Sequence, residues 1–243
     1  MKFQYFSDVN VQFLSSTDVA LIRIRPEAPY LLICGDIGSP SLATYHEFLH
    51  LVAPLFQRVF VISGNQEAFG STPSTSDASI RKIVGRFDNV TFMQNEAYHF
   101  PDSDVSVFGA TFWTQIPYIM HRFIVERIAD YINIHSFSPA SACKLHEASV
   151  LALRGALEST PGRRWVVMSH HAPRVELSDA RWRDAAINVA FASDVPEALD
   201  TRVVAWCFGH STTPSVVRDR FFCNPIAYDG DFPGFDYCRT FTV

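Results

Sequence analysis

Disulfide frameworks, long hydrophobic runs and a surplus of positive charge are all missing from this sequence. The cysteines are odd in number and form no Cys-x-x-Cys pair; they are Cys34, Cys143, Cys207, Cys223 and Cys238. Such scattered cysteines exclude a small disulfide-stabilised module. We therefore expect reduced thiols and an intracellular, cytosol-like compartment.

No stretch approaches the roughly 20 consecutive apolar residues that a membrane helix needs, so we expect neither a transmembrane segment nor a membrane partner. The apolar run within residues 1–8 is too short for a secretory signal peptide. The formal net charge is −5, from 20 basic and 25 acidic residues, which argues against nucleic acid as a partner.

What the sequence does contain is enough apolar material for a large core. Of its 243 residues, 48% are hydrophobic and 14% are aromatic, while the charged fraction of 19% is too low for a disordered chain. We expect a single domain over residues 1–243, because a chain of this length can bury one extensive core.

Strand and helix patterns alternate along the chain, which predicts an α/β architecture. Continuous apolar runs that stop at glycine or polar residues are typical of strands buried on both faces. Such runs predict strands at residues 2–6, 30–34, 59–62, 165–169 and 203–208, and further strands at 90–92, 105–108, 221–223 and 237–243. Apolar residues at helical spacing predict helices at residues 42–56, 77–87, 118–131 and 139–158, and a loop is expected at 70–76.

Small polar signatures follow the buried strand runs. They read Asp8-Val9-Asn10, Gly35-Asp36, Gly64-Asn65-Gln66-Glu67, Ser169-His170-His171 and Gly209-His210-Ser211-Thr212. Ligands of α/β sheets bind beyond the carboxyl ends of the strands, so these side chains should meet in one region. Carboxylate, amide and imidazole groups together suit a transition metal such as Mn, Fe or Zn. Taken singly, each signature could equally be a turn or a helix cap.

The order of these segments resembles the motif series of the calcineurin-like metallophosphoesterase family, especially its small single-domain members. That series runs D-x-H, G-D, G-N-H-[ED], an isolated H and G-H-x-H, and the ending Asn224-Pro225 with Gly234-Phe235-Asp236 is similar too. The resemblance covers nearly the whole chain. It implies a four-layer sandwich, with two facing β-sheets flanked by helices and a metal site at the sheet edge.

The resemblance also implies two metal-ligand sets, of which one is complete. The complete set is Asp36, Asn65, His170 and His210. The other set shares Asp36 and keeps only Asp8 besides. Asn10 and Thr212 stand where the family has histidine, so these are weak or lost ligand positions.

Gln66 replaces a third motif histidine, one that the family is thought to use toward the leaving group or the phosphate. An amide can donate a hydrogen bond to a phosphate oxygen but cannot transfer a proton near neutral pH. His171 is a further candidate for contacting substrate or orienting a ligand, although a plain loop role fits it as well. Glu67 is a candidate for bracing a ligand, with a solvated surface position as the alternative.

These substitutions predict one firmly bound divalent metal at most, Mn, Fe or Zn, or none, with a weakened second site that suits Mg or Ca. The leading hypothesis is an inactive or strongly attenuated pseudoenzyme that acts as an interaction or scaffold subunit with a protein partner in a larger assembly. The alternative is an active metal-dependent hydrolase of phosphate mono- or diesters that uses mainly one tightly held metal.

Overall fold

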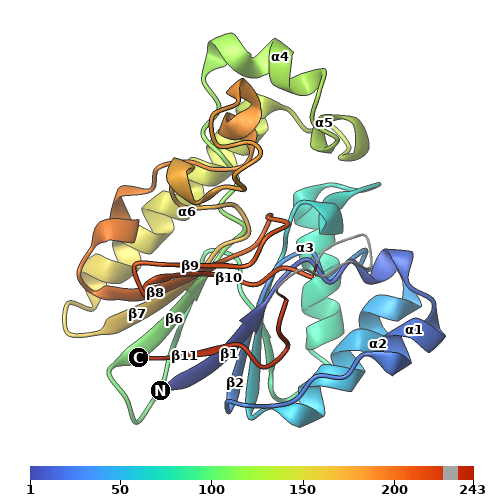
Figure 1. The fold of residues 1–243 in the computed structure, drawn as a ribbon, viewed down its shortest axis with the longest axis vertical. Coiled ribbons are helices and arrows are strands. Elements are labelled where there is room, and N and C mark those ends of the chain that lie inside the picture. The colour runs from blue at the N-terminus through green and yellow to red at the C-terminus, as the bar shows by residue number, and fades with distance from the viewer. Residues whose placement is uncertain (227–234) are drawn as a thin grey trace.

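The computed structural model describes residues 1–226 and 235–243 and contains two β-sheets that pack face to face (Figure 1). The first sheet has the order β11-β1-β2-β3-β4, in which only β11 is antiparallel to its neighbour. Its strands are β1 (Lys2–Phe6), β2 (Tyr30–Cys34), β3 (Arg58–Ile62), β4 (Val90–Phe92) and β11 (Thr240–Thr242).

The second sheet has the order β5-β6-β7-β8-β10-β9, with a parallel centre and antiparallel strands at both edges. Its strands are β5 (Glu96–His99), β6 (Val105–Gly109), β7 (Arg164–Met168), β8 (Val203–Phe208), β9 (Ser215–Val217) and β10 (Phe221–Cys223). Because the central strands of both sheets are parallel, their carboxyl ends emerge at one edge.

Helices cover the outer face of each sheet, which gives the four layers that the sequence predicts (Figure 1). On the first sheet these are α1 (Ser16–Leu21), α2 (Ala43–Val52) and α3 (Pro73–Val84). The long helix α6 (Pro139–Ser159) packs on the second. The short helices α4 (His121–Val125) and α5 (Asp130–Asn133) stand beyond the sheet edge, at the top of Figure 1.

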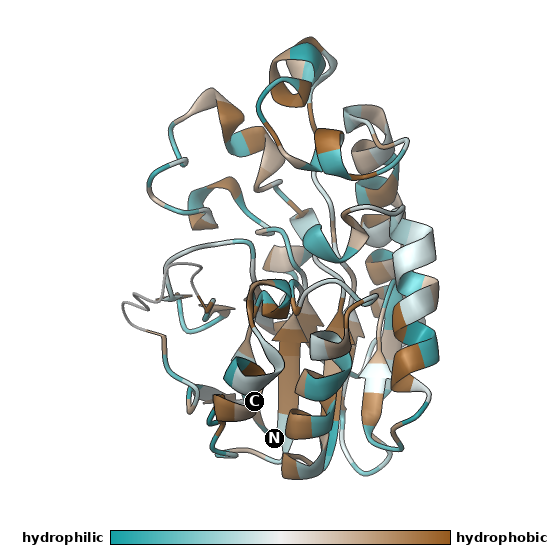
Figure 2. Cartoon of the chain, turned by 90° about the vertical axis from the view of Figure 1, so that its right-hand side faces the viewer, coloured by the Kyte–Doolittle hydropathy of each residue, from teal (hydrophilic) through white to brown (hydrophobic). Residues whose placement is uncertain are grey.

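Aromatic and aliphatic side chains from both sheets fill the space between them. Phe3, Phe60 and Val107 are completely buried there, as are Met168 and Cys207. Burying one such side chain contributes about 1.5–3 kcal/mol, so this layer stabilises the packing of the two sheets against each other. Figure 2 shows the apolar strands at the centre and helices with both apolar and polar residues around them.

Two helix predictions need correction. Residues 73–76 form no loop, because α3 begins at Pro73, where a missing N–H costs nothing, and Thr72 accepts a hydrogen bond from the Thr75 N–H at 3.2 Å. The helix predicted at residues 118–131 is broken between α4 and α5. The buried Asp130, at the start of α5, accepts a hydrogen bond from the Asn65 side chain, a long-range contact that no local pattern records.

The strand predictions were more accurate at the centre of the sheets than at their edges. The edge strands β5 and β9 were missed, and the C-terminal strand is limited to Thr240–Thr242. The sequence analysis also noted a family-like ending that includes Asn224 and Gly234. Asn224 is buried and donates hydrogen bonds to the carbonyls of Tyr5 and Asp236. Gly234 lies outside the described residues. Among the described helices, none combines the length and apolarity needed to cross a membrane.

Candidate metal centre

Five candidate ligands follow the carboxyl ends of five parallel strands. Asp8, Asp36 and Asn65 follow β1, β2 and β3 of the first sheet, and His170 and His210 follow β7 and β8 of the second. His210 is half-buried, and the other four residues are buried. The two sheets thus deliver their polar loop residues to the same edge.

The backbone at this edge adopts an uncommon conformation. The φ angles of Asp8, Asn10, Asp36 and His210 are 59°, 56°, 54° and 54°, all in the left-handed region. Asn, Asp and His tolerate this region better than other residues with a Cβ, yet it still costs free energy. Backbone strain of this kind concentrates at functional sites, where the surrounding structure enforces it.

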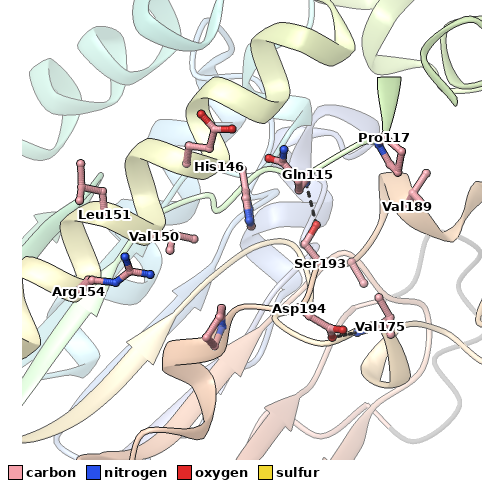
Figure 3. Close-up of a pocket in the computed structure, with 13 residues that line it drawn as sticks. Gln115, Pro117, His146, Val150, Leu151, Arg154, Val175, Val189, Ser193 and Asp194 are labelled. Atoms are coloured by element: carbon pink, nitrogen blue, oxygen red, sulfur yellow. Dashed lines mark hydrogen bonds between the residues drawn. The ribbon is translucent and has the colours of Figure 1, made fainter. Parts of the chain in front are cut away.

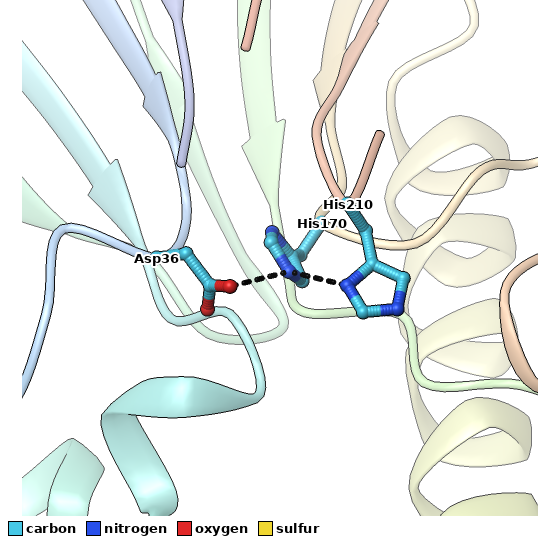
Figure 4. Close-up of side chains that lie close together, drawn as sticks. All are labelled: Asp36, His170 and His210. Atoms are coloured by element: carbon cyan, nitrogen blue, oxygen red, sulfur yellow. Dashed lines mark hydrogen bonds and ion pairs between the residues drawn. The ribbon is translucent and has the colours of Figure 1, made fainter. Parts of the chain in front are cut away.

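Four ligand atoms converge on one point at the sheet edge. The Nε2 atom of His170 lies 3.0 Å from Oδ1 of Asn65, 3.1 Å from Nδ1 of His210 and 3.4 Å from Oδ2 of Asp36. Figure 4 shows the two imidazoles and the Asp36 carboxylate turned toward one another. The ligand atoms of Asp36, His170 and His210 all lie within 4.8 Å of one another, a spacing that one metal ion can bridge.

The hydrogen bonds behind these atoms orient them toward the centre. Nδ1 of His170 lies 2.9 Å from the Cys34 carbonyl oxygen, which can only accept, so this nitrogen carries the hydrogen and Nε2 faces the site. The Asn65 amide donates to Oδ1 of Asp130 at 2.7 Å, which turns its own oxygen toward His170. Facing lone pairs at these distances require a metal ion or a proton between them, so the donor set fits a metal.

The protonation states of these groups depend on one another. Burial opposes charge on His170, but the Asp36 carboxylate outweighs it and raises the His170 pKa above its usual range. Burial alone would raise the pKa of Asp36, yet His170 holds it below its usual value. Burial, with the charge on His170, lowers the pKa of His210 to about 3, which keeps that imidazole neutral and able to bind metal.

Glu67 holds two of the ligand loops together from beneath. Its Oε2 accepts hydrogen bonds from the backbone N–H groups of Gly64 at 2.8 Å and Asp36 at 3.1 Å. Its Oε1 accepts one from the Ile37 N–H at 2.7 Å. Glu67 therefore braces the site as expected, and it acts on the backbone rather than on a ligand side chain.

Asp130 is a site residue that the sequence analysis missed. It is buried on α5, and it orients Asn65 although the two residues are far apart in the chain. Burial raises its pKa to about 6, against the lowering effect of the Asn65 hydrogen bond. No motif surrounds Asp130 in the sequence, so no local signal could have identified it.

Asp8 and Asn10, from the incomplete metal-ligand set, already form hydrogen bonds with protein groups. Oδ2 of Asp8 accepts from the His210 N–H at 3.1 Å, and the Asn10 side chain donates to the Asp8 carbonyl at 2.8 Å. Oδ1 of Asn10 accepts from Gln12 at 3.2 Å. Burial and the neighbouring Asp36 carboxylate raise the pKa of Asp8 to about 7, although His170 opposes the shift.

The other two substituted positions are equally engaged. Gln66 donates to Asp36 twice, from its backbone N–H at 3.0 Å and from its side chain at 2.8 Å. The Thr212 hydroxyl donates to Oδ2 of Asp179 at 2.5 Å and accepts from Nη2 of Arg181 at 2.6 Å. The roles proposed for these residues stay predictions; Gln66 contacts the centre directly through Asp36, and Thr212 lines the cavity above it.

His171 lies behind the centre rather than in it. Its ring is buried, 4.6 Å from the His210 ring and 5.3 Å from the Trp113 ring between centroids. Burial and the neighbouring histidines lower its pKa well below the usual value. This placement supports a role in orienting His210 more than a contact with substrate.

A cavity of about 420 Å³ opens over the converging ligand atoms. Asp36, Asn65 and His210 form part of its lining, and residues 127–130, between and within the two short helices, form another part. Arginine and aromatic side chains also line it; they are Arg127, Arg181, Phe13, Phe69, Trp182 and Phe191. The site is therefore accessible to a small ligand from solvent.

A second cavity, of about 530 Å³, lies beside α6 and is lined mainly by apolar side chains such as Val150 and Val189 (Figure 3). Two of its polar groups are already paired: Nδ1 of His146 bonds to the Trp113 carbonyl at 2.8 Å, and Ser193 accepts from the Gln115 N–H at 2.8 Å. None of the four ligand residues lines this cavity, so the chemistry belongs to the smaller one.

Comparison with solved structures supports this interpretation of the fold. The chain superimposes on the phosphopantetheinyl hydrolase PptH of Mycobacterium tuberculosis with a TM-score of 0.73, covering 96% of this chain and 91% of that one at 14% identity. This chain has a metallophosphoesterase-type fold. The protein TT1561 of Thermus thermophilus is similar as well, with a TM-score of 0.50 and 10% identity over 85% of this chain and 80% of that one.

Sequence comparison adds one relative. The chain is 24% identical over 236 residues to "Uncharacterized protein L509" of Acanthamoeba polyphaga mimivirus, a match that covers 86% of this chain and 83% of that protein. No family model matches the chain. The structural similarity establishes the fold. Because the sequence identities are low, the chemistry must be argued from the residues of the site.

Replacing Gly64 by alanine should disrupt the centre. A Cβ at this position would overlap Oδ1 of Asp36 and lie 2.7 Å from its backbone nitrogen, so Asp36 must move. We expect Mn²⁺ to bind at least about 10-fold more weakly, as when a ligand's support is lost. Isothermal titration calorimetry of the metal-free variant measures this directly.

Gly155→Ala is the matched control, because a Cβ there meets nothing within 4 Å on α6. This variant should bind Mn²⁺ as the wild type does and gain about 0.5–1 kcal/mol in unfolding free energy. Equal Mn²⁺ affinity in the Gly64 and Gly155 variants would show that Asp36 is not positioned by this close contact.

Proposed function

We propose that the protein is a metal-dependent phosphate ester hydrolase that works with one metal ion and is strongly attenuated. The observation that carries this proposal is the convergence of Asp36, Asn65, His170 and His210 at the floor of an open cavity. The four ligand atoms face one another beneath a solvent-accessible space, an arrangement that a bound cation would stabilise.

The four residues would hold Mn²⁺, Fe²⁺ or Zn²⁺, since two imidazoles favour these ions over Mg²⁺. A cation bound there would act as a Lewis acid on a phosphoryl oxygen and lower the pKa of a water molecule. Asp8, Asn10 and Thr212 offer only oxygen atoms, which suit a weakly held Mg²⁺ or Ca²⁺. The protein thus supplies one tight site and one weak site.

Attenuation follows from what the remaining side chains cannot do. Gln66 lies beside the Asp36 carboxylate and can donate a hydrogen bond to a phosphate oxygen, but it cannot pass a proton to a leaving group. A positioned general acid typically contributes about 10²–10⁴-fold to the rate. Losing this group and one metal together should cost several orders of magnitude.

The test is to measure metal content and turnover on the same sample. The purified protein is stripped with a chelator, reloaded with limiting Mn²⁺, and assayed by mass spectrometry of the metal and with an aryl phosphate ester. We expect one Mn²⁺ per chain and a kcat at least about 10²-fold below the roughly 10 per second typical of enzymes. Two tightly bound transition-metal ions, or no bound metal at all, would contradict the proposal.

A protein-interaction role is a second proposal, supported by the exposed end of the molecule near α4. Tyr118 and Ile119 are adjacent and each 88% exposed, which is unusual for large apolar side chains on a free surface. If this end binds another copy of the chain, sedimentation should show concentration-dependent association that Tyr118→Ser with Ile119→Ser abolishes. If wild type and double variant sediment alike, with no dependence on concentration, this interaction proposal loses its support.

A further inference from the structure

Arg181 stands beside the position where the incomplete metal set lost a ligand. Thr212 occupies the last place of the segment 209–212, and its hydroxyl oxygen accepts a hydrogen bond from Nη2 of Arg181 at 2.6 Å. Arg181 and Thr212 both line the cavity above the four ligand atoms. A permanent positive charge is therefore held next to the place that a second metal ion would use.

We propose that the Arg181 guanidinium binds the phosphoryl oxygens of the ester and supplies the positive charge that a second metal ion would otherwise provide. This inference rests on the proposed function, because it assumes that a phosphate ester occupies the cavity. It assigns to Arg181 a direct contact with substrate, and to Asp179 a positioning role.

Asp179 holds Arg181 in place from behind. Oδ1 of Asp179 accepts hydrogen bonds from the Arg181 backbone N–H at 2.9 Å and from Nε at 3.2 Å, and Oδ2 lies 3.4 Å from Nη2. The side chain of Asp179 is only 6% exposed, whereas that of Arg181 is 59% exposed. The carboxylate is thus buried as an anchor and the guanidinium projects into accessible space.

The anchor leaves part of the guanidinium available to a ligand. Among residues 1–226 and 235–243, Arg181 uses Nε and Nη2 for Asp179 and Thr212, and Nη1 has no hydrogen-bond partner. Nη1 can therefore donate a hydrogen bond between charged groups to a phosphate oxygen, while the other nitrogens stay anchored. Arg127 also lines the cavity, but its Nη1 donates to the Phe123 carbonyl at 3.1 Å and to Glu126 at 3.3 Å, and no hydrogen bond joins it to the described segment 209–212.

The charge of the cavity favours such a cation. Its lining includes the carboxyl groups of Asp8, Asp36, Asp130 and Asp179, which repel a phosphate dianion wherever they are ionised. One divalent metal ion at the four-ligand site offsets only part of that negative charge. A guanidinium on the cavity wall adds attraction at the phosphoryl group, and hydrogen bonds between charged groups strengthen where substrate displaces water.

The test uses the full chain loaded with Mn²⁺ and inorganic phosphate as the probe. Arg181→Gln should leave one Mn²⁺ per chain and weaken phosphate binding at least about 10-fold, as expected for lost hydrogen bonds between charged groups. Arg181→Lys keeps the charge without the planar pair of donors and should recover only part of the affinity. The KM for an aryl phosphate should rise in the same order.

Asp179→Asn and Arg122→Gln complete the series. Asp179→Asn should weaken phosphate binding, but by less than Arg181→Gln does, because the guanidinium is then present but loosely held. Arg122→Gln, at a side chain 93% exposed on α4, should bind phosphate like the wild type. Circular dichroism verifies folding, and if Arg181→Gln does not fold, Arg181→Lys decides.

The inference would be overturned if Arg181→Gln bound phosphate as tightly as the wild type. If the glutamine variant is unfolded, wild-type affinity in Arg181→Lys would overturn it. Wild-type protein that binds Mn²⁺ but no phosphate would overturn it as well. Failure of the wild type to bind Mn²⁺ contradicts the proposed function itself. Metal content therefore separates the two failures.

Discussion

Replacing Asn10, Gln66 and Thr212 together by histidine is expected to raise phosphate ester hydrolysis at least about 10²-fold, the contribution of a positioned general acid alone. The triple change would complete the ligand set around Asp8 and restore an imidazole beside the Asp36 carboxylate. Histidine also tolerates the left-handed backbone of Asn10, where φ is 56°. Turnover of an aryl phosphate with added Mn²⁺ measures the gain.

The three single variants are the controls for this experiment. Each should change turnover little, because metal ligands and a general acid act as a unit and their effects are not additive. Thr212→His alone should even be harmful, since it removes the hydroxyl that contacts both Asp179 and Arg181. A wild-type kcat already near roughly 10 per second would show that the three residues are a working alternative. A folded triple variant that binds two metals but stays inert would place the defect in substrate access.

Asp36→Asn is expected to abolish function by removing metal. Asp36 is the only carboxylate among the four converging ligands, and its oxygens also accept both hydrogen bonds from Gln66. Asparagine keeps the shape but loses the negative charge, so Mn²⁺ should bind at least about 10²-fold more weakly, beyond the loss typical of supporting residues. Calorimetric titration with Mn²⁺ gives the affinity.

Thermal unfolding provides an independent measurement of the same loss. Mn²⁺ should raise the midpoint of the wild type, because a ligand that binds only the folded state stabilises it, and should leave Asp36→Asn unchanged. Asp102→Asn, in an exposed turn before β6, is the matched control and should respond like the wild type. A stoichiometric Mn²⁺ ion retained by Asp36→Asn would show that the four residues do not form the metal site.

The central strands of both sheets could be predicted from the sequence because each is buried on both faces. The runs at residues 30–34 and 203–208 are continuously apolar and are each followed by a glycine, a pattern that depends on local composition alone. The edge strand β5 has the sequence EAYH and a mostly exposed pattern, so no apolar run marks it. Its strand geometry comes from pairing with β6.

Some site residues could likewise be predicted from their neighbours in the sequence, whereas others are defined only by long-range contacts. Asp36 and His210 were predictable because each follows a glycine at the end of a strand run. Asp130 and Arg181 were not, because their roles depend on Asn65 and Thr212, which lie in other parts of the chain. A single sequence records a residue's neighbours along the chain, and these contacts exist only after the loops have come together.

The left-handed residues at the sheet edge set stability and metal binding against each other. Glycine adopts this backbone without a Cβ penalty, so replacing Asp8, Asn10, Asp36 or His210 by glycine would relieve about 1 kcal/mol of strain at each. At Asp8, Asp36 and His210 the same replacement removes a carboxylate or imidazole that is a candidate metal ligand. At Asn10 it removes only an amide. In a library selected only for thermostability and then screened for bound metal, glycine should therefore accumulate first at Asn10.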